Sequence, residues 1–264
     1  MALRLVVSGA RGRMGTALAR LIAEAPDLEL VGGIGREAAA PADGPGAGGR
    51  IETPEGAGPL IGGADVLLDF SAPEFLARIL DLHADALAGR GLVVGTTGLD
   101  DAVLRRLDAA AVRGPVLVAA NFSVGVNLLL ALVERAAALL DADRYDVEII
   151  ESHHRRKADA PSGTALALGR AVAAGRGVAL DAVRRDGRSG RPGPRPPGEV
   201  GFHAVRGGAV VGDHQVVFLG ERERLALAHS AIDRSLFAEG ALTAARWIAG
   251  RAPGHYEMRD ALGV

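Results

Sequence analysis

Short apolar runs alternate with longer segments of helical periodicity through the first half of the chain. The runs end at small or polar residues, so we expect each to form a buried strand, and the longer segments predict amphipathic helices. This alternation is typical of a doubly wound parallel sheet and predicts an α/β, Rossmann-like fold. The expected strands are 3–8, 28–34, 64–70, 92–94 and 116–119. The expected helices are 14–24, 71–88 with Ser71 as its N-cap, 100–112 and 126–140.

The pattern changes after Tyr145, where short apolar runs follow one another with few helices between them. Strands are expected at 145–150, 201–206, 209–213, 215–219 and 224–230, which favours a mixed or antiparallel sheet in an α+β domain. A helix is predicted at 165–174, and the last one, 235–250, is expected to return to the first domain. We therefore predict a dinucleotide-binding domain of residues 1–123 and 234–264, and a substrate-binding and oligomerisation domain of residues 124–233.

Two segments predict loops rather than strands or helices. Residues 38–59 are rich in Gly, Ala and Pro. Residues 186–199 are polar and proline-rich, and we expect their arginines to be solvated.

Length, net charge and cysteine content exclude several classes of function. The 264 residues suit about two domains, and 48% are apolar, enough for a sizeable core. A net charge of −2 gives no reason to expect nucleic acid or an acidic membrane as partner, and no apolar run reaches membrane-spanning length. The chain has no cysteine, which excludes a disulfide framework and a thiol nucleophile. The sequence enters a strand at its third residue, and a cytoplasmic location is expected.

A glycine loop follows the first expected strand. Its spacing, G-x-x-G-x-x-G over residues 9–15, is a variant of the dinucleotide fingerprint, in which glycine permits a tight turn and close approach of the pyrophosphate. The alternative is an ordinary turn between strand and helix in a glycine-rich protein. The residues predicted here to contact cofactor are Gly9, Ala10, Arg11, Gly12, Arg13 and Met14.

The end of the second expected strand bears on cofactor choice. Gly35 stands where an acid for the ribose hydroxyls is usual, and Arg36 follows it. An arginine suits a 2′-phosphate dianion, although a solvated arginine at a strand end is nearly as good an explanation. Glu37 is a possible substitute for the missing acid, and spacing alone does not decide between these readings.

Two further turns follow expected strands, at the edge where parallel sheets bind ligands. Each taken alone is equally compatible with a simple turn or an asparagine cap. The residues concerned are Gly95, Thr96 and Thr97 in the first turn, and Ala119, Ala120, Asn121 and Phe122 in the second.

Residues 151–165 read E-S-H-H-R-R-K-A-D-A-P-S-G-T-A and carry the densest chemistry in the chain. Histidine supplies a proton near neutrality, lysine pairs with carboxylates, and a helix N-terminus at the Ser-Gly-Thr turn attracts an anion. Adjacent histidines on an extended segment diverge, so a metal site is not expected. Ser162 lies outside any G-x-S-x-G elbow, so a hydrolase is poorly supported, and Asp159 is expected to brace the loop.

This segment resembles the signature of the bacterial dihydrodipicolinate reductases, E-x-H-H-x-x-K-x-D-x-P-S-G-T-A, at every specified position. The resemblance extends to residues 9–15, 95–98, 119–127 and 201–214. It implies hydride transfer from NADPH and/or NADH to a small cyclic dicarboxylate, a homotetramer built through the second domain, and a nicotinamide site at residues 95–98 and 119–122. It also implies that His153 is the acid/base group and that Lys157 is a second donor. Substrate is then expected to be bound by His154 and by the backbone N–H groups of Ser162, Gly163 and Thr164.

Two other functions remain open from the residues alone. One is a related two-domain dehydrogenase of the amino-acid or aspartate type, with the same cofactor fold and another substrate. The other is a nucleotide sensor without chemistry, against which the intact His153, His154 and Lys157 argue. The remaining histidines are expected to be structural or solvent-facing: His83, His203, His214, His229 and His255.

Overall fold

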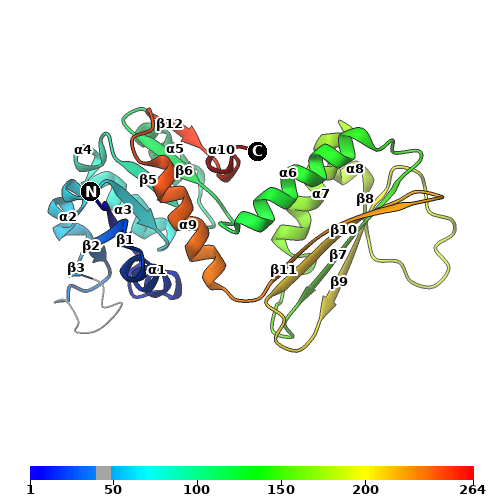
Figure 1. The fold of residues 1–264 in the computed structure, drawn as a ribbon, viewed down its shortest axis with the longest axis horizontal. Helices are drawn as coiled ribbons and strands as arrows, with labels where there is room; N and C mark the ends of the chain where they lie inside the picture. Colours follow the sequence, from blue (N-terminus) through cyan, green and yellow to red (C-terminus); the bar gives the residue numbers. More distant parts are fainter. Residues whose placement is uncertain (40–48) are drawn as a thin grey trace. The chain divides into compact units, whose positions relative to one another are not determined.

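The computed structural model describes residues 1–39 and 49–264, and these residues form two compact units. Unit 1 consists of Met1–Val124 and Ser235–Gly263, and unit 2 of Gly125–Arg234 with the terminal Val264. The chain therefore passes from unit 1 into unit 2 after Val124 and returns to unit 1 at α9 (Ser235–Ile248), which β12 and α10 follow (Figure 1).

Unit 1 is built on a parallel sheet. Within the described residues it has seven strands, and each neighbouring pair is parallel. Parallel neighbours need a crossover connection, and helices supply most of these crossovers here. Their order across the sheet is β12 (Gly254–Tyr256), β6 (Pro115–Val118), β5 (Gly91–Val94), β4 (Val66–Asp69), β1 (Leu3–Ser8), β2 (Leu28–Ile34) and β3 (Ile51–Glu52).

The strand order reverses at β1, which pairs with β2 on one side and β4 on the other. An open parallel sheet forms a crevice at such a reversal, outside the carboxyl ends of its strands. The segments at that edge follow β1, β2 and β4, which places the glycine loop beside residues 35–37 and 70–75.

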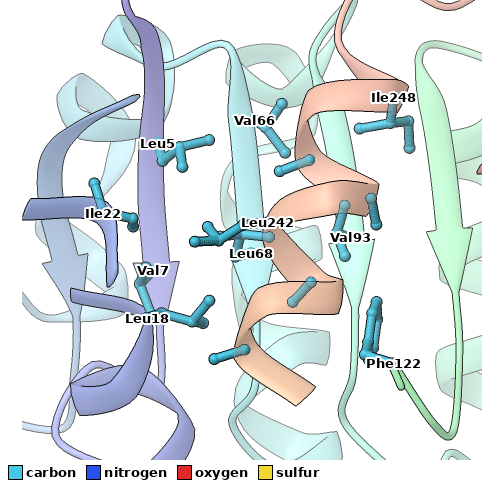
Figure 2. Close-up of a cluster of buried hydrophobic side chains, with 14 of the residues drawn as sticks. Leu5, Val7, Leu18, Ile22, Val66, Leu68, Val93, Phe122, Leu242 and Ile248 are labelled. Carbon is cyan, nitrogen blue, oxygen red and sulfur yellow. The ribbon is translucent and has the colours of Figure 1, made fainter. Parts of the chain in front are cut away.

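The helices of unit 1 cover both faces of this sheet. α9 lies over β4 and β5, and its Leu242 and Ile248 share one core cluster with Leu68 and Val93 (Figure 2). The helices of the unit are α1 (Arg13–Glu24), η1 (Pro54–Gly56, a 3-10 turn), α2 (Gly58–Gly63), α3 (Pro73–Leu82), α4 (Ala84–Leu87), α5 (Asp101–Ala111), α9 (Ser235–Ile248) and α10 (Met258–Leu262).

The helix predicted over 71–88 is wrong in two respects. It is broken at His83, whose backbone leaves the helical region. Its N-cap is Ala72 rather than Ser71, because the Ser71 hydroxyl donates to the buried Asp69 carboxylate instead. The loop predicted at 38–59 also contains β3, η1 and part of α2, while its residues 40–48 lie outside the described part of the chain.

Unit 2 has a mixed sheet, as expected. Its described strands follow the order β11 (Arg224–Ala231), β10 (Gly212–Leu219), β7 (Asp146–His153), β9 (Val200–Arg206) and β8 (Arg184–Asp186). The pairs β11/β10 and β10/β7 are antiparallel, whereas β7/β9 and β9/β8 are parallel. The separate strand predicted at 209–213 is wrong, because β10 runs without a break through His214.

Helices α6 (Val124–Leu139) and α7 (Gly163–Arg176) pack together on this sheet, and the short α8 (Leu180–Val183) follows (Figure 1). Alternate residues of β7 are buried, and Val147 and Ile149 lie in the core. The same alternation turns Glu151 and His153 toward the interior, so core packing sets the direction of the candidate acid.

Two of the three arginines in the loop after β8 are not solvated as predicted, whereas Arg191 is exposed. Arg188 and Arg195 both donate to Glu148 on β7, at 3.0 Å each. Their side chains are only 25% and 16% exposed. The loop is therefore fastened to the sheet by charge pairs rather than extended into solvent.

The predicted fold class is confirmed: a Rossmann-like parallel sheet and a second, mixed sheet. In the described part of the chain, no helix combines the length and apolar character that a membrane span needs.

Candidate active site

The glycine loop of unit 1 is a tight turn that a larger residue would break. Gly9 has φ +76°, and a Cβ added there would lie 2.4 Å from the Phe70 carbonyl oxygen. A Cβ on Gly15 would lie equally close to the Gly9 carbonyl oxygen. The loop leads into α1 at Arg13 with Gly12 as N-cap, so the first amides of the helix point out of the turn without partners in the helix.

A cavity of about 460 Å³ lies beside this loop, at the carboxyl ends of β1, β2 and β4. Arg11 and Arg36 give it positive charge, and Glu37 is 3.8 Å from Arg11. This lining fits a dinucleotide. The amides at the start of α1 and the two arginines suit its phosphates, and Gly35 places no carboxylate at the end of β2, where an acid usually binds the ribose. Its lining residues are Gly9, Arg11, Gly12, Gly35, Arg36, Glu37, Phe70, Ser71, Ala72 and Phe75.

Not every residue predicted for the cofactor lies on this cavity. Arg13 is the first residue of α1 and is exposed, and Met14 packs against the core of unit 1. Arg11, which was also predicted, lies on the cavity together with Arg36.

The two other predicted turns are tied to the same edge of the sheet. The Thr96 hydroxyl donates to Asp69 over 2.5 Å and accepts from the Ser71 N–H over 2.9 Å. Gly95 leaves room for the Phe70 ring, and that ring packs on Phe122 at 5.2 Å between centroids. The turns 95–97 and 119–122 thus meet through Phe70, a residue that the sequence did not single out.

Asp69 is fully buried at the end of β4 and was missed by sequence reasoning. Burial raises the pKa of Asp69, although hydrogen bonds from Thr96 and Ser71 oppose the shift. Its signal in the sequence was the D-F-S after an apolar run, which we interpreted as a helix cap.

In unit 2, His153 is held by the carboxylate two residues before it. His153 Nδ1 is 2.5 Å from Glu151 Oε2, and the two side chains are 11% and 1% exposed. Arg206 donates to both oxygens of Glu151, at 2.8 and 2.7 Å. Burial alone would raise the pKa of Glu151, but hydrogen bonds from Arg206, His153 and the Ser162 N–H outweigh it and lower the pKa.

His214 belongs to this cluster, which corrects the expectation that it stands apart. Its ring meets the ring of His153 edge-on at 5.1 Å, and its Nε2 is 3.1 Å from the Ser162 hydroxyl oxygen. Burial is the largest cause that lowers the pKa of His214 to about 4, followed by the nearby His153. His214 is therefore neutral at physiological pH.

The N-terminus of α7 opens beside this cluster. Ser162 caps the helix by accepting from the Ala165 N–H, and its own N–H donates to Glu151. The prediction that the Ser162 N–H faces a substrate carboxylate is thus wrong for this structure. A Cβ on Gly163 would meet no atom within 4 Å, so the helix start is open at that residue.

Positive charge gathers after β7. Lys157 Nζ lies 2.8 Å from Asp159 Oδ1, so Asp159 braces the loop as expected. His154 Nδ1 accepts from the Arg156 N–H, and the Arg234 guanidinium lies 3.4 Å from His154 Nε2. Burial, then the charges of Arg234 and Arg156, lower the pKa of His154. Arg234 was not predicted, because it lies 80 residues from His154 in sequence.

The described residues hold no group of three or more His, Cys, Asp or Glu side chains placed to bind a metal ion. The cluster around His153 combines imidazole, a carboxylate and cations, which suits proton transfer to an anionic ligand.

Comparison with known proteins identifies relatives along the whole chain. A family model described as "Dihydrodipicolinate reductase, N-terminus" matches residues 3–122, and its C-terminal counterpart matches residues 125–262. The 4-hydroxy-tetrahydrodipicolinate reductase of Thiobacillus denitrificans is 47% identical and covers 100% of both chains. That of Caulobacter vibrioides is 45% identical over 98% of this chain and 97% of the relative.

Solved structures agree with the sequence relatives. The dipicolinate-bound dihydrodipicolinate reductase from Paenisporosarcina sp. TG-14 superposes with a TM-score of 0.74 at 25% identity, covering 97% of this chain and 98% of that one. A C. glutamicum DAP dehydrogenase reaches 0.53 at 15% identity, covering 97% and 92%, and shares the fold only.

The low pKa of His214 predicts a stability that depends on pH. Between pH 6.5 and about 4, His214 is protonated in the unfolded chain but remains neutral in the folded protein. The free energy of unfolding therefore falls as the pH drops through this window and is fully restored above pH 6.5. The loss is up to about 3 kcal/mol at 1.36 kcal/mol per pH unit. His214→Gln should remove this part of the pH dependence in urea unfolding at pH 4.5 and 7. A variant with the parent's full pH dependence would contradict the assignment.

Proposed function

Because the chain belongs to the dihydrodipicolinate reductase family, we propose that the cluster around His153 is its active site. The reaction is the NAD(P)H-dependent reduction of 4-hydroxy-tetrahydrodipicolinate to tetrahydrodipicolinate with loss of water, a step of lysine and diaminopimelate synthesis. The observation that carries the site is the buried His153, whose Nδ1 is bound by Glu151 and whose ring lies beside the start of α7.

Unit 1 would hold the cofactor, which supplies a hydride when bound. The α1 amides would bind the pyrophosphate and Arg11 and Arg36 the adenosine end, since these groups line the cavity beside the glycine loop. The turns joined through Phe70 would receive the nicotinamide: Gly95, Thr96 and Thr97, with Ala119, Ala120, Asn121 and Phe122.

Unit 2 would bind the dicarboxylate. The cations Lys157 and Arg234 would attract its carboxylates, with the His154 ring beside them, and the backbone N–H groups of Gly163 and Thr164 would bind one of them at the α7 N-terminus. His153 would donate the proton from Nε2, since its Nδ1 is engaged. Ser162 would serve this site indirectly, by capping α7 and binding Glu151.

We propose that the protein is a homotetramer assembled through the sheet face of unit 2 that α6 and α7 leave uncovered. Two exposed apolar side chains on that face support it, Val205 and Leu219, whose β7 partners Ser152 and Asp146 point away from the core. A cytoplasmic location follows from the use of NAD(P)H in biosynthesis.

The first test replaces the proposed acid. His153→Gln should keep the fold and cofactor binding and lower turnover by roughly 10²–10⁴-fold, the usual contribution of a positioned general acid. His255→Gln, which removes an exposed histidine paired with Asp108 in unit 1, is the control and should keep parental turnover. NAD(P)H oxidation with freshly generated substrate measures both. Turnover of His153→Gln within a few-fold of the parent would remove His153 from the role.

The second test concerns the anion site. Lys157→Ala should weaken binding of pyridine-2,6-dicarboxylate by roughly ten-fold or more, because it removes a charge-assisted contact of about 1.5–3 kcal/mol. Nucleotide affinity should hardly change, and Arg170→Ala, on the exposed side of α7, should leave both affinities unchanged. Calorimetric titration of each ligand provides the readout. Parental affinity of Lys157→Ala for the dicarboxylate would exclude Lys157 as a ligand.

The third test concerns cofactor choice. With no acid at position 35 and Arg36 on the cavity, NADPH should be used at least as well as NADH. Arg36→Ala should raise the KM for NADPH roughly ten-fold or more and change the KM for NADH little, since only NADPH carries the 2′-phosphate. Arg20→Ala, which removes an exposed cation of α1, is the matched control. Equal losses with both cofactors would mean that Arg36 does not contact the phosphate.

A further inference from the structure

We propose that Glu151, clamped by Arg206, is a positioning residue that fixes the tautomer and orientation of the His153 ring, and that Gly212 keeps the space at His153 Nε2 open for the reacting group. This proposal rests on the proposed function, in which His153 donates the proton. It gives a role in the reaction to three further residues, one on each of the strands β7, β9 and β10.

The geometry begins with the register of the sheet. Glu151 and His153 are two residues apart on β7 and therefore face the same side. Arg206 is the β9 partner of His153, and His214 is the β10 partner of Glu151. The strand pairing thus brings a guanidinium and a second imidazole to the acid's position.

The carboxylate of Glu151 is fully committed. It accepts two bonds from Arg206, one from the Ser162 N–H at 3.1 Å and one with His153 Nδ1 at 2.5 Å. An ionised carboxylate has about four lone-pair sites and no proton, so it can only accept hydrogen bonds. Each of its partners must therefore be a donor. His153 must therefore carry its proton on Nδ1.

This commitment determines what Nε2 can do. With Nδ1–H bound to Glu151, Nε2 is a lone pair in the neutral ring and a donor in the imidazolium. Every proton exchanged with a ligand then passes through Nε2. Arg206 also donates to the Asp159 carbonyl oxygen over 2.6 Å, so the same guanidinium fastens the loop that carries Lys157.

Gly212 controls the space at that atom. A Cβ added to Gly212 would lie 3.0 Å from His153 Nε2 and 3.4 Å from its Cδ2. The backbone at Gly212 does not require glycine, because its φ is not in the positive range. The absent side chain is therefore explained by the room it leaves beside Nε2.

The first experiment reads the tautomer without using activity. Long-range ¹H–¹⁵N spectra of protein with ¹⁵N-labelled histidine, assigned with His153→Gln, should show Nδ1–H for His153 at a pH where the spectrum itself shows a neutral ring. An Nε2–H tautomer in the parent would overturn the proposal. The spectrum reports on Glu151 even if His153→Gln retains turnover, so failure of the proposed function is distinguishable from failure of this inference.

Glu151→Gln is the matching variant, because it keeps size and removes the charge. Its His153 signal should shift toward Nε2–H, and kcat should fall roughly 10–10²-fold with little change in substrate KM, as is usual for a partner that orients a functional histidine. An unchanged tautomer with parental kcat would overturn the positioning role.

Gly212→Ala tests whether the space beside His153 Nε2 is needed. It also provides a test of the proposal if Glu151→Gln does not fold. It leaves every Glu151 contact in place, so the Nδ1–H signal should persist while kcat falls at least ten-fold. Gly207→Ala is the control: Gly207 lies in the loop between β9 and β10, and a Cβ added there would have no atom within 4 Å, so this variant should retain parental kcat. Parental kcat in Gly212→Ala would show that the space beside Nε2 is not used.

Discussion

The site in unit 2 depends on one interaction, the burial of the Glu151 carboxylate under the Arg206 guanidinium. A buried carboxylate is costly unless it is paired and hydrogen-bonded, so this charge needs its donors in place. Those donors are His153 on the same strand, Arg206 on the neighbouring strand and the Ser162 N–H at the start of α7. By satisfying one charge, the fold fixes the imidazole, the helix start and the loop between them together.

Unit 1 treats its own buried carboxylate differently. Asp69 lies at the end of β4 and its recorded hydrogen bonds come from the hydroxyls of Ser71 and Thr96, without a cation among them. Burial therefore raises the pKa of Asp69, whereas the fork from Arg206 helps to lower the pKa of Glu151. Asp69 joins Ser71 to Thr96 of the turn 95–97 through neutral donors, and Glu151 is paired with the charged Arg206. Each holds the end of its strand in place through hydrogen bonds.

Much of the fold could be predicted from sequence because periodicity is local. The buried strands, most of the longer helices and the change of pattern after Tyr145 all follow from it. The short β12 and α10 were missed because a few residues carry no period. The capping role of Ser71 was misassigned because it depends on the buried Asp69. Likewise, His153 and Lys157 stand in one recognisable segment, whereas Arg206 and His214 reach that segment only through strand pairing, 55 and 52 residues from Glu151 and Ser162.

That pairing explains why two separate sequence patterns behave as one site. The segment after Tyr145 supplies His153, the proposed acid, and its Glu151 carboxylate, and the segment 201–214 supplies the guanidinium, the second imidazole and Gly212. Neither segment positions His153 alone: without Arg206 the carboxylate of Glu151 would lose two of its donors, and without Gly212 the ring would be crowded at Nε2. All of these contacts lie inside unit 2. The orientation of the His153 ring, the proposed proton donor, is therefore determined within that unit and needs no group from unit 1.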